Sequence, residues 1–362
     1  MSDEHPVSLV EIAAEMAGAA PEADPVATAA IEHFELCRSL ADAFPMQFAP
    51  HARRFEALRS QLEERLLDAA PSARAGDRDI PRVPPETLSE SDFDTFVRRP
   101  CPVIFDGAAR DVAAVRNRTP SFFRERYGDY PGLLATETKW DIPGKLSDAI
   151  ADILDPKEEN LYAQNIANIF NDHPDLEAQL ELDRFLPHLG RGRHLGTHLF
   201  IGGSRTGTNF HCANNLNIFF NVHGEKEWFF VHPKHTFWMY GLLHKTGGYG
   251  DSPVDHRRPA AEQRETFPLY EHVPVYSARL EPGDVLINPP WWWHAVNNLT
   301  DATIACAVRW TPYEIEDANP IFSLAQSLMP HTKDVRRALR DPKARITDEL
   351  YREGFEPIRK SR

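Results

Sequence analysis

The chain lacks several features that would assign it to a broad class of protein. No apolar run approaches the ~18–20 residues needed to cross a bilayer, and the acidic start Met1–Ser2–Asp3–Glu4 is not followed by an apolar leader. We therefore expect a cytoplasmic protein without a membrane span. Cysteine is scarce and never occurs as Cys-x-x-Cys, which disfavours a disulfide framework or a zinc finger and predicts free thiols. The four cysteines are Cys37, Cys101, Cys212 and Cys306.

Positive charge is also in short supply. Lys and Arg number 40 against 54 Asp and Glu, which gives a formal net charge of -14. Binding to a nucleic-acid backbone draws on clustered Lys and Arg, so nucleic acid is not expected as the main partner. Basic residues gather only in residues 333–362, where a solvated helix face is the favoured interpretation. A peptide, a protein or a small molecule is the expected partner.

The length of 362 residues favours one large core with helical additions over two equal domains. Residues 1–70 are rich in Ala, Leu and Glu with apolar residues at helical spacing, and 313–362 is a second predicted helical segment. These helices are expected to pack on the core or on a second copy of the chain, as in a homodimer. The proline-rich stretch 71–87 is predicted to be a linker.

Residues 88–312 have the pattern of short strands separated by Gly and Pro turns. Strands are expected at 102–105, 199–201 and 303–310, and at 285–287 after the turn Glu281–Pro282–Gly283–Asp284. Residues 216–222 and 226–231 are expected to pair as a hairpin across His223–Gly224. The predicted fold is mainly β with helical additions, a small antiparallel barrel or jelly roll whose mouth holds a ligand. The polar insertion 233–272 is a candidate lid or substrate-binding segment.

Two histidines, His211 and His294, lie beside predicted strands of this barrel. Two imidazoles and one carboxylate on one face of Fe(II) leave three open positions for oxygen and a bidentate co-substrate. That arrangement needs two ligands at i and i+2 on one strand, and a histidine from a distant strand. Position 213 has the required spacing from His211, but it is Ala213 and cannot bind a metal.

These residues, with their neighbours, resemble the JmjC-type, cupin-like Fe(II)/2-oxoglutarate oxygenases over residues of about 88 to 312. The segment Thr208–Asn209–Phe210–His211 is similar to the family's first metal-binding strand, with His-x-Asp altered to His-x-Ala. The turn at 281–284 and the segment Pro289–Pro290–Trp291–Trp292–Trp293–His294 resemble the strand and second histidine ligand. The stretch 99–104 resembles the opening strand. The resemblance implies a double-stranded β-helix, the jelly roll of this family.

The resemblance also implies a site for 2-oxoglutarate. Thr208 matches a hydroxyl residue that contacts the co-substrate, Asn217 matches a polar residue six positions after the first ligand, and Lys226 matches the lysine that pairs with the distal carboxylate. A partly buried ammonium needs an anion partner, although a solvent-facing lysine is the alternative for Lys226. Arg309 stands where the family often has asparagine. It binds a carboxylate in one interpretation and forms an internal ion pair in the other.

Three hypotheses account for the missing carboxylate. In the first, water or a halide such as chloride occupies the position beside Ala213, as in non-haem iron halogenases, which have Ala or Gly there. In the second, another side chain completes the site and permits a different metal. In the third, the barrel is a non-catalytic binding or assembly protein. The candidates for a replacement ligand are Cys212, Asn214, Asn215, Asn217, His232, His235, His244 and Asp251.

The expected activity is therefore hydroxylation of a C–H bond in a peptide, protein or small molecule, with halogenation as an alternative. Trp291, Trp293 and Asn221 are the candidates for a substrate pocket. Adjacent side chains on a strand face opposite ways, so the three indoles of 291–293 cannot all point toward a substrate. Packing in the core is the favoured role for this triplet.

Overall fold

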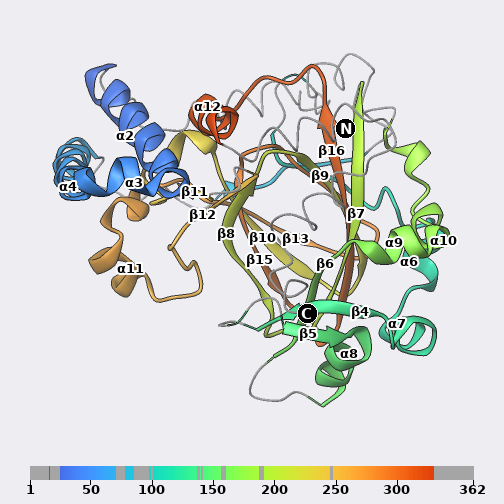
Figure 1. The fold of residues 1–362 in the computed structure, drawn as a ribbon. Helices are drawn as coiled ribbons and strands as arrows, with labels where there is room; N and C mark the ends of the chain where they lie inside the picture. Colours follow the sequence, from blue (N-terminus) through green and yellow to red (C-terminus); the bar gives the residue numbers. More distant parts are fainter. Residues whose placement is uncertain are drawn as a thin grey trace, which may run out of the picture.

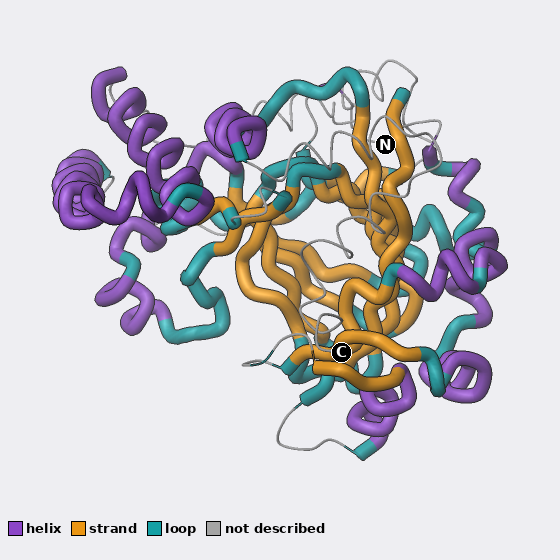
Figure 2. Tube along the Cα trace, in the orientation of Figure 1, coloured by secondary structure: helices purple, strands orange, loops and turns teal. Residues whose placement is uncertain are grey.

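The structure is a computed structural model that describes residues 25–70, 78–84, 101–136, 142–155, 160–186, 191–244 and 248–329, with Met16, Arg98 and Lys139 as single residues. Within these ranges the strands form two sheets that enclose a barrel, shown as orange tube in Figure 2. The predicted jelly-roll core with helical additions is confirmed.

One sheet has seven strands and the other has nine in the described part of the chain. In spatial order the first contains β1 (Arg78–Asp79), β13 (Tyr276–Leu280), β10 (Lys226–Val231), β15 (Trp293–Asn298), β8 (Gly207–Ala213), β12 (Tyr249–Asp251) and β11 (Leu242–Leu243). The second contains β2 (Arg82–Val83), β3 (Val103–Phe105), β14 (Val285–Asn288), β9 (Leu216–His223), β16 (Thr303–Pro312), β7 (Gly192–Gly202), β6 (Tyr162–Ile166), β4 (Pro131–Ala135) and β5 (Ile142–Lys145).

The predicted hairpin of 216–222 with 226–231 is wrong. Strand β9 pairs with β14 and β16 in the nine-stranded sheet, whereas β10 pairs with β13 and β15 in the other sheet. The chain changes sheets at Gly224, whose φ of 68° lies in the region that favours glycine. A Cβ there would lie 2.1 Å from the carbonyl oxygen of Ala302. The short connection that suggested a hairpin is instead a corner of the barrel.

Helices cover two sides of the barrel (Figure 1). The N-terminal helices lie on one side, where α2 contacts α12, and the helices between β3 and β7 lie on the other. Thr119 caps α7, because its hydroxyl accepts from the amide of Phe122. The helices are α2 (Pro25–Ala43), α3 (Pro45–Phe48), α4 (Ala52–Ala69), α6 (Ala113–Asn117), α7 (Pro120–Tyr127), α8 (Leu146–Leu154), α9 (Asn168–Asp172), α10 (Pro174–Ala178), α11 (Ala260–Thr266) and α12 (Pro320–Leu328), with the short 3-10 turns η1 (Ala49–His51), η3 (Leu182–Arg184), η5 (Pro233–His235) and η6 (Pro268–His272).

The predicted linker 71–87 is partly strand. Residues 71–77 and 85–87 lie outside the described residues, but β1 and β2 pair in parallel with β13 and β3. Ile80 and Val83 are buried, and Arg82 forms an ion pair of 2.6 Å with the buried carboxylate of Asp284. Burial of two apolar side chains and this ion pair fix the segment to both sheets despite its prolines.

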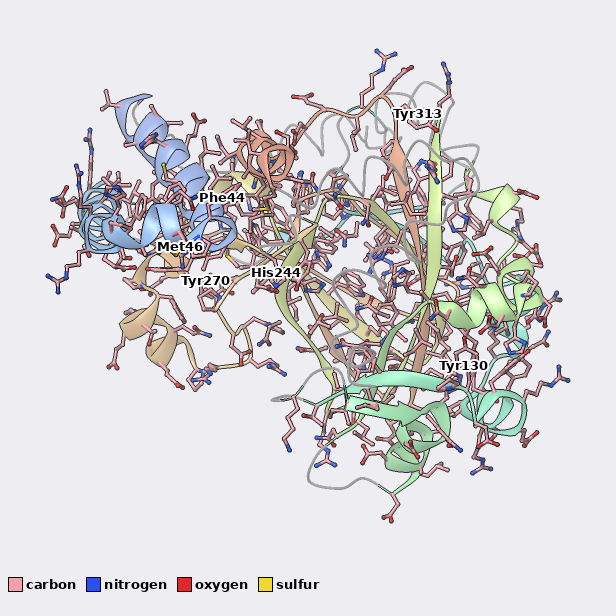
Figure 3. All side chains as sticks on the ribbon, in the orientation of Figure 1. Phe44, Met46, Tyr130, His244, Tyr270 and Tyr313 are labelled. Carbon is pink, nitrogen blue, oxygen red and sulfur yellow. The ribbon has the colours of Figure 1, made fainter. Side chains whose placement is uncertain are left out.

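Two hydrophobic clusters divide the molecule. One fills the barrel and the space beneath α6–α10, and the other lies between the outer face of the seven-stranded sheet and helices α2, α4 and α12. We call this second region the seam. Part of the insertion 233–272 belongs to it, because Phe237, Trp238 and Leu269 pack there. Figure 3 shows Phe44 and Met46 on the same helical side, with Tyr130 across the barrel.

Cys37, Cys101, Cys212 and Cys306 are free thiols, as predicted. None of the helices in the described ranges is both long and apolar enough to span a bilayer. The basic stretch 333–362 lies outside the described residues.

Candidate functional site

The two histidines lie side by side on the inner face of the seven-stranded sheet. His294 of β15 is directly opposite His211 of β8, and their ring centroids are 4.1 Å apart. A register shift between them and the next pair, Val296 with Thr208, puts one extra residue in β8. Since Val296 and His294 share a face, this bulge brings Thr208 to the same face as His211, although the two are three residues apart.

Both rings are held in the same tautomer. Nδ1 of His211 donates to the carbonyl of Asn209 at 2.8 Å, and Nδ1 of His294 donates to that of Trp292 at 2.9 Å. Because a carbonyl oxygen only accepts, each Nδ1 carries the proton and each Nε2 keeps its lone pair. Nε2 of His294 accepts from the amide of Asn288 at 3.2 Å. Such backbone support is typical of histidines that ligate metals through Nε2.

Both imidazoles are neutral at physiological pH. Burial is the main cause, and it lowers the pKa of His211 to about 4 and that of His294 well below its usual range. The positive charge of Arg309 lowers both pKa values further. A neutral imidazole is the form that binds a metal, so protonation does not oppose a metal here.

The described residues do not supply a third protein ligand. Ala213 lies two residues after His211 on β8, so an acidic side chain at 213 would project on the same side as the histidine. Asp251 is directly opposite His211, and burial raises the pKa of its carboxyl to about 6, but the residue is largely open to solvent and is not arranged with the histidines to hold a metal. No group of three or more His, Cys, Asp or Glu within the described ranges is arranged to hold a metal ion.

The other proposed replacement ligands are placed elsewhere or engaged otherwise. Cys212 is buried in the seam, on the opposite face of β8 from His211. His244 stacks on Tyr249 with ring centroids 4.4 Å apart, and Nδ1 of His232 accepts from the amide of Lys234. His235 is buried in η5, at the start of the insertion. Two histidines therefore fit a metal, and the remaining positions would be filled by molecules from outside the chain.

Lys226 is on the same inner face, and it is fully buried. It lies opposite Asn298 on β15, four residues beyond His294. Nζ donates to Oδ1 of Asn298 and, at 3.0 Å, to Oγ1 of Thr303, and it lies 5.8 Å from the centre of the Tyr162 ring. Burial lowers the pKa of Lys226 to about 7, and no carboxylate among the described residues raises it. The solvent-facing alternative for Lys226 is wrong.

The nine-stranded sheet faces these groups with a polar row of its own. Asn288, Asn217 and Arg309 are directly opposite one another on β14, β9 and β16. Oδ1 of Asn288 and Oδ1 of Asn217 are buried without a partner in the described part of the chain. Nη2 of Arg309 donates to Oδ1 of Asn165 at 3.4 Å. The positive charge of the guanidinium is close enough to lower the pKa of both His211 and His294. The two sheets thus place an asparagine-rich, cationic row across from the histidine pair.

Sequence reasoning missed several residues of this interior, among them Tyr162, His198, Trp228 and Asn288, and the Lys226 partners Asn298 and Thr303. His198 of β7 is 8% exposed, and neither ring nitrogen has a hydrogen-bond partner among the described residues. Trp228 stacks on His294 with its indole N–H likewise unpaired. Two features of the sequence could have indicated these positions: His198 lies inside an apolar strand, and Trp228 follows Lys226 by two residues. Alternation alone, however, does not say which face of a strand points into the barrel.

Thr208 completes the set of inner residues found from the sequence. Its Oγ1 is buried and has no hydrogen-bond partner in the described ranges. A buried hydroxyl or amide without a partner costs about 1–3 kcal/mol, so the gathering of several such groups in one interior indicates a missing binding partner. Thr208, Asn217, Asn288, His198 and Trp228 all contribute unpaired atoms.

Three residues predicted for a substrate pocket have other roles. Trp291 and Trp293 are buried in the seam, where their indole N–H groups donate at 3.0 Å to Ser323 of α12 and to Thr236. Asn221 donates to the carbonyls of Gly224 and Leu280 and so fixes the corner between β9 and β10. Trp293 points outward from β15 while His294 points inward, and Trp291, which precedes the strand, packs in the same cluster. Packing in the core, the favoured role for this triplet, therefore holds for both tryptophans in place of the pocket.

Comparison with known proteins agrees with this class of fold. The family model described as a cupin-like domain matches residues 143–314, so the barrel is a cupin-like domain. The family model ends close to the end of β16 and includes both histidines, Lys226 and Arg309.

Two curated proteins are similar to part of the chain. An HSPB1-associated protein 1 homolog from Danio rerio is 28% identical over 155 residues, which cover 42% of this chain and 33% of that protein. HSPB1-associated protein 1 from Homo sapiens is 28% identical over 141 residues, covering 38% of this chain and 28% of that protein. The similarity thus spans about a third or less of the length of these relatives.

Proposed function

We propose that the barrel is an Fe(II)/2-oxoglutarate-dependent oxygenase-type enzyme with a two-histidine metal site. The observation that carries this proposal is Lys226, a fully buried ammonium that shares an interior with the histidine pair and has no carboxylate partner in the described part of the chain. A buried charge without a counter-charge is strongly unfavourable, so an anionic ligand is expected to complete it. A dicarboxylic co-substrate provides that anion.

Each inner residue has a definite part in this proposal. Nε2 of His211 and Nε2 of His294 would hold the metal, with their Nδ1 protons fixed by backbone carbonyls; on His294 the metal would replace the contact with the amide of Asn288. Lys226 and Thr208 would bind the distal carboxylate of 2-oxoglutarate, while Asn217 and Arg309 lie at the level of the histidines and would bind its other end. Iron with bound 2-oxoglutarate would supply the oxygen-activating chemistry that oxidises a C–H bond.

The substrate approaches from the histidine end. His211, Ala213 and Arg309 are partly exposed, whereas Lys226 is sealed by Asn298, Thr303 and Tyr162. The names of the relatives describe association with another protein. A peptide or protein side chain is therefore one proposed substrate class, beside a small molecule.

Halogenation is a second proposed activity, favoured by Ala213. Its methyl group on the side of His211 leaves the position of an acidic ligand open, and the nearby positive charge of Arg309 favours an anion there. A non-catalytic binding role is a third, favoured by the lack of a third ligand among the described residues.

Anaerobic titration of the full chain with Fe(II) and 2-oxoglutarate, with and without chloride, tests the proposal. The visible charge-transfer band of the chelate is expected in the wild type and is lost in His211→Ala. Exposed His33, which lies on α2 away from the barrel, offers the matched control His33→Ala. Oxygen consumption coupled to succinate release then measures turnover. A wild-type protein that retains no iron and gives no band contradicts the enzyme and favours the binding role.

Ala213→Asp separates the two activities. In a hydroxylase with water at the third position, the added carboxylate strengthens iron binding and retains hydroxylation. In a halogenase, it removes the halide and abolishes halogenation, and a chloride-dependent shift of the band disappears with it. A band insensitive to chloride in the wild type contradicts halogenation.

A further inference from the structure

The short strand β12 adds one residue to the row of histidines. Asp251 of β12 is the register partner of His211 on β8, and His211 is in turn the partner of His294 on β15. Directly opposite residues of an antiparallel pair share a face of the sheet, with Cα atoms about 4.5–5.5 Å apart. Asp251 is therefore the next side chain along the sheet from the histidine pair.

The orientation of Gly250 supports this face for Asp251. Gly250 is the partner of Cys212, whose thiol is buried in the seam, and a Cβ at Gly250 would lie 3.1 Å from that sulfur. Because side chains alternate along a strand, Asp251 and Tyr249 project to the other side of the sheet, with the histidines. Tyr249 is the partner of Ala213, the position without a carboxylate.

Asp251 gives this inner surface a negative charge. None of the inner positions on β8, β9, β10, β15 and β16 in the described ranges is acidic, whereas Lys226 is a cation. The carboxylate of Asp251 has no hydrogen bond or ion pair with the described residues, and Arg257, which also contacts β8, pairs with Asp255 instead. Water satisfies an open carboxylate, so the position of Asp251 beside the histidines is what indicates a ligand.

Two aromatic rings accompany the carboxylate. The rings of His244 and Tyr249 stack with centroids 4.4 Å apart and planes at 14°, and the backbone amide of His244 donates to the carbonyl of Tyr249. Tyr249 is partly exposed and Asp251 is open to solvent, so both can be reached from outside the barrel. The hydrocarbon stem of a long cationic side chain packs well on an aromatic ring while its charged end pairs with a carboxylate.

We propose that Asp251 selects a cationic substrate, the ammonium or guanidinium of a lysine or arginine side chain in a peptide, and holds it beside His211. This inference rests on the proposed function, because it concerns the substrate of the same site. The two signs of charge have separate roles. Lys226, which is buried, pairs with the anionic co-substrate, and Asp251, at the solvent side, pairs with the substrate. The formal net charge of -14 attracts a cationic peptide as well.

Affinity selection on the immobilised full chain tests this inference. Pools of acetylated pentapeptides, degenerate except for a central lysine, norleucine or glutamate, are applied anaerobically with Fe(II) and 2-oxoglutarate, and again in EDTA. Retention of the lysine pool is expected to exceed that of the norleucine pool about threefold, as for an ion pair that is open to solvent, and that of the glutamate pool by more. Mass spectrometry of the eluted peptides measures both ratios.

Substitutions assign the preference to the carboxylate. Asp251→Asn should bring the lysine and norleucine pools to equal retention, whereas Asp251→Glu should keep the preference. Asp129→Asn is the matched control, because Asp129 is an exposed carboxylate that pairs with Lys145 and follows α7, on the opposite side of the barrel from β12 (Figure 1). Thermal unfolding of each variant shows that it is folded, and the preference kept in Asp251→Glu separates loss of charge from loss of fold.

Two results would overturn the inference. These are equal retention of the lysine and norleucine pools by the wild type, and a lysine preference that survives in Asp251→Asn. The charge-transfer band of the iron chelate is recorded on the same samples. A normal band without a lysine preference contradicts this inference alone. A lysine preference in EDTA without any band contradicts the proposed enzyme and leaves Asp251 as the binding residue for a cationic peptide, so the two failures are distinguishable.

Discussion

Trp293 and Trp228 lie on opposite faces of the seven-stranded sheet, and they differ in whether the indole N–H has a hydrogen-bond partner. Both are buried, and both belong to adjacent strands that pair in register. The indole N–H of Trp293 donates to Thr236 in the seam, whereas that of Trp228 has no partner among the described residues of the barrel interior. Among the described residues the indole N–H groups of the seam tryptophans Trp291 and Trp293 are paired, whereas Nη2 of Arg59 at the edge of the seam has no hydrogen-bond partner. The interior leaves groups open, as a ligand site does.

Electrostatics distinguish the two regions in the same way. Charged side chains at the boundary of the seam find aromatic faces or counter-ions, for example Arg59 over the ring of Tyr240 at 4.3 Å. In the interior, Lys226 has only neutral hydrogen-bond partners within the described ranges. Substitutions in the seam should therefore change stability, and substitutions in the interior should change ligand binding.

Removal of a seam indole is expected to have the largest effect. Trp293→Ala should lower the free energy of unfolding by about 3–5 kcal/mol, because it leaves a large cavity at a fully buried position and removes the hydrogen bond to Thr236. Chemical denaturation measures this loss. A decrease below 1 kcal/mol would contradict the view that this face is built for stability.

The corresponding substitution in the barrel interior, to compare with Trp293→Ala in the seam, is Lys226→Met. Loss of the ammonium should weaken 2-oxoglutarate binding by about 2–4 kcal/mol, which is about 30-fold to 1,000-fold, while the free energy of unfolding stays the same or rises. Isothermal titration calorimetry and denaturation of the same variant report the two quantities. Unchanged affinity would remove Lys226 from the ligand site.

Ligand affinity should also depend on pH through Lys226. The charged lysine is the form that binds a carboxylate, and burial lowers its pKa from near 10.5 to about 7 in the ligand-free protein. Affinity should therefore fall as pH rises above about 7, with a limiting slope of about tenfold per pH unit. The neighbouring Tyr162 stays neutral, because burial raises its pKa.

The stability of the ligand-free protein should show the opposite trend. Between about pH 7 and pH 10 the unfolded chain binds a proton at Lys226 that the folded chain has released, so stability contributed by this group rises with pH. Comparison of the wild type with Lys226→Met isolates the effect. A pH-dependent affinity that persists in Lys226→Met would assign it to another group.

The smallest expected effects come from a matched pair of indole substitutions. Trp293→Phe removes a satisfied N–H and should destabilise the protein by about 1 kcal/mol. Trp228→Phe removes an unpaired N–H, so stability should not fall for that reason, and dicarboxylate affinity should decrease by severalfold. Equal losses of stability in both variants would contradict the distinction between seam and interior.

The fold was largely predictable from local patterns. Strand β3 and the turn at 281–284 with β14 after it were both expected, because turn residues and strand patterns act over a few positions. The connection at Gly224 was misjudged for a physical reason. A two-residue turn suits both a hairpin and a corner, and only the pairing of β9 and β10 with different sheets decides between them.

The candidate site was predictable in part. His211, His294, Thr208 and Lys226 came from spacing and resemblance, and their place on one inner face depends on a bulge that no alternation rule predicts. Core packing was the favoured role for Trp291 and Trp293, and they do pack in the seam; that they lie on the outer face was not predictable, because a strand's sequence does not state which of its faces looks inward. His198 was missed for the same reason.

By itself the sequence determined the class of fold, the two histidines and the absence of a carboxylate at Ala213, because these depend on residue identity and short-range spacing. Only the tertiary structure decided that Arg309 and Asn288 face the histidines, that His198 lies near Arg309, that Lys226 is sealed from solvent, and that the tryptophans belong to the seam. Those facts depend on how two sheets are brought together, and residues far apart in the chain meet only when hydrophobic burial closes the barrel.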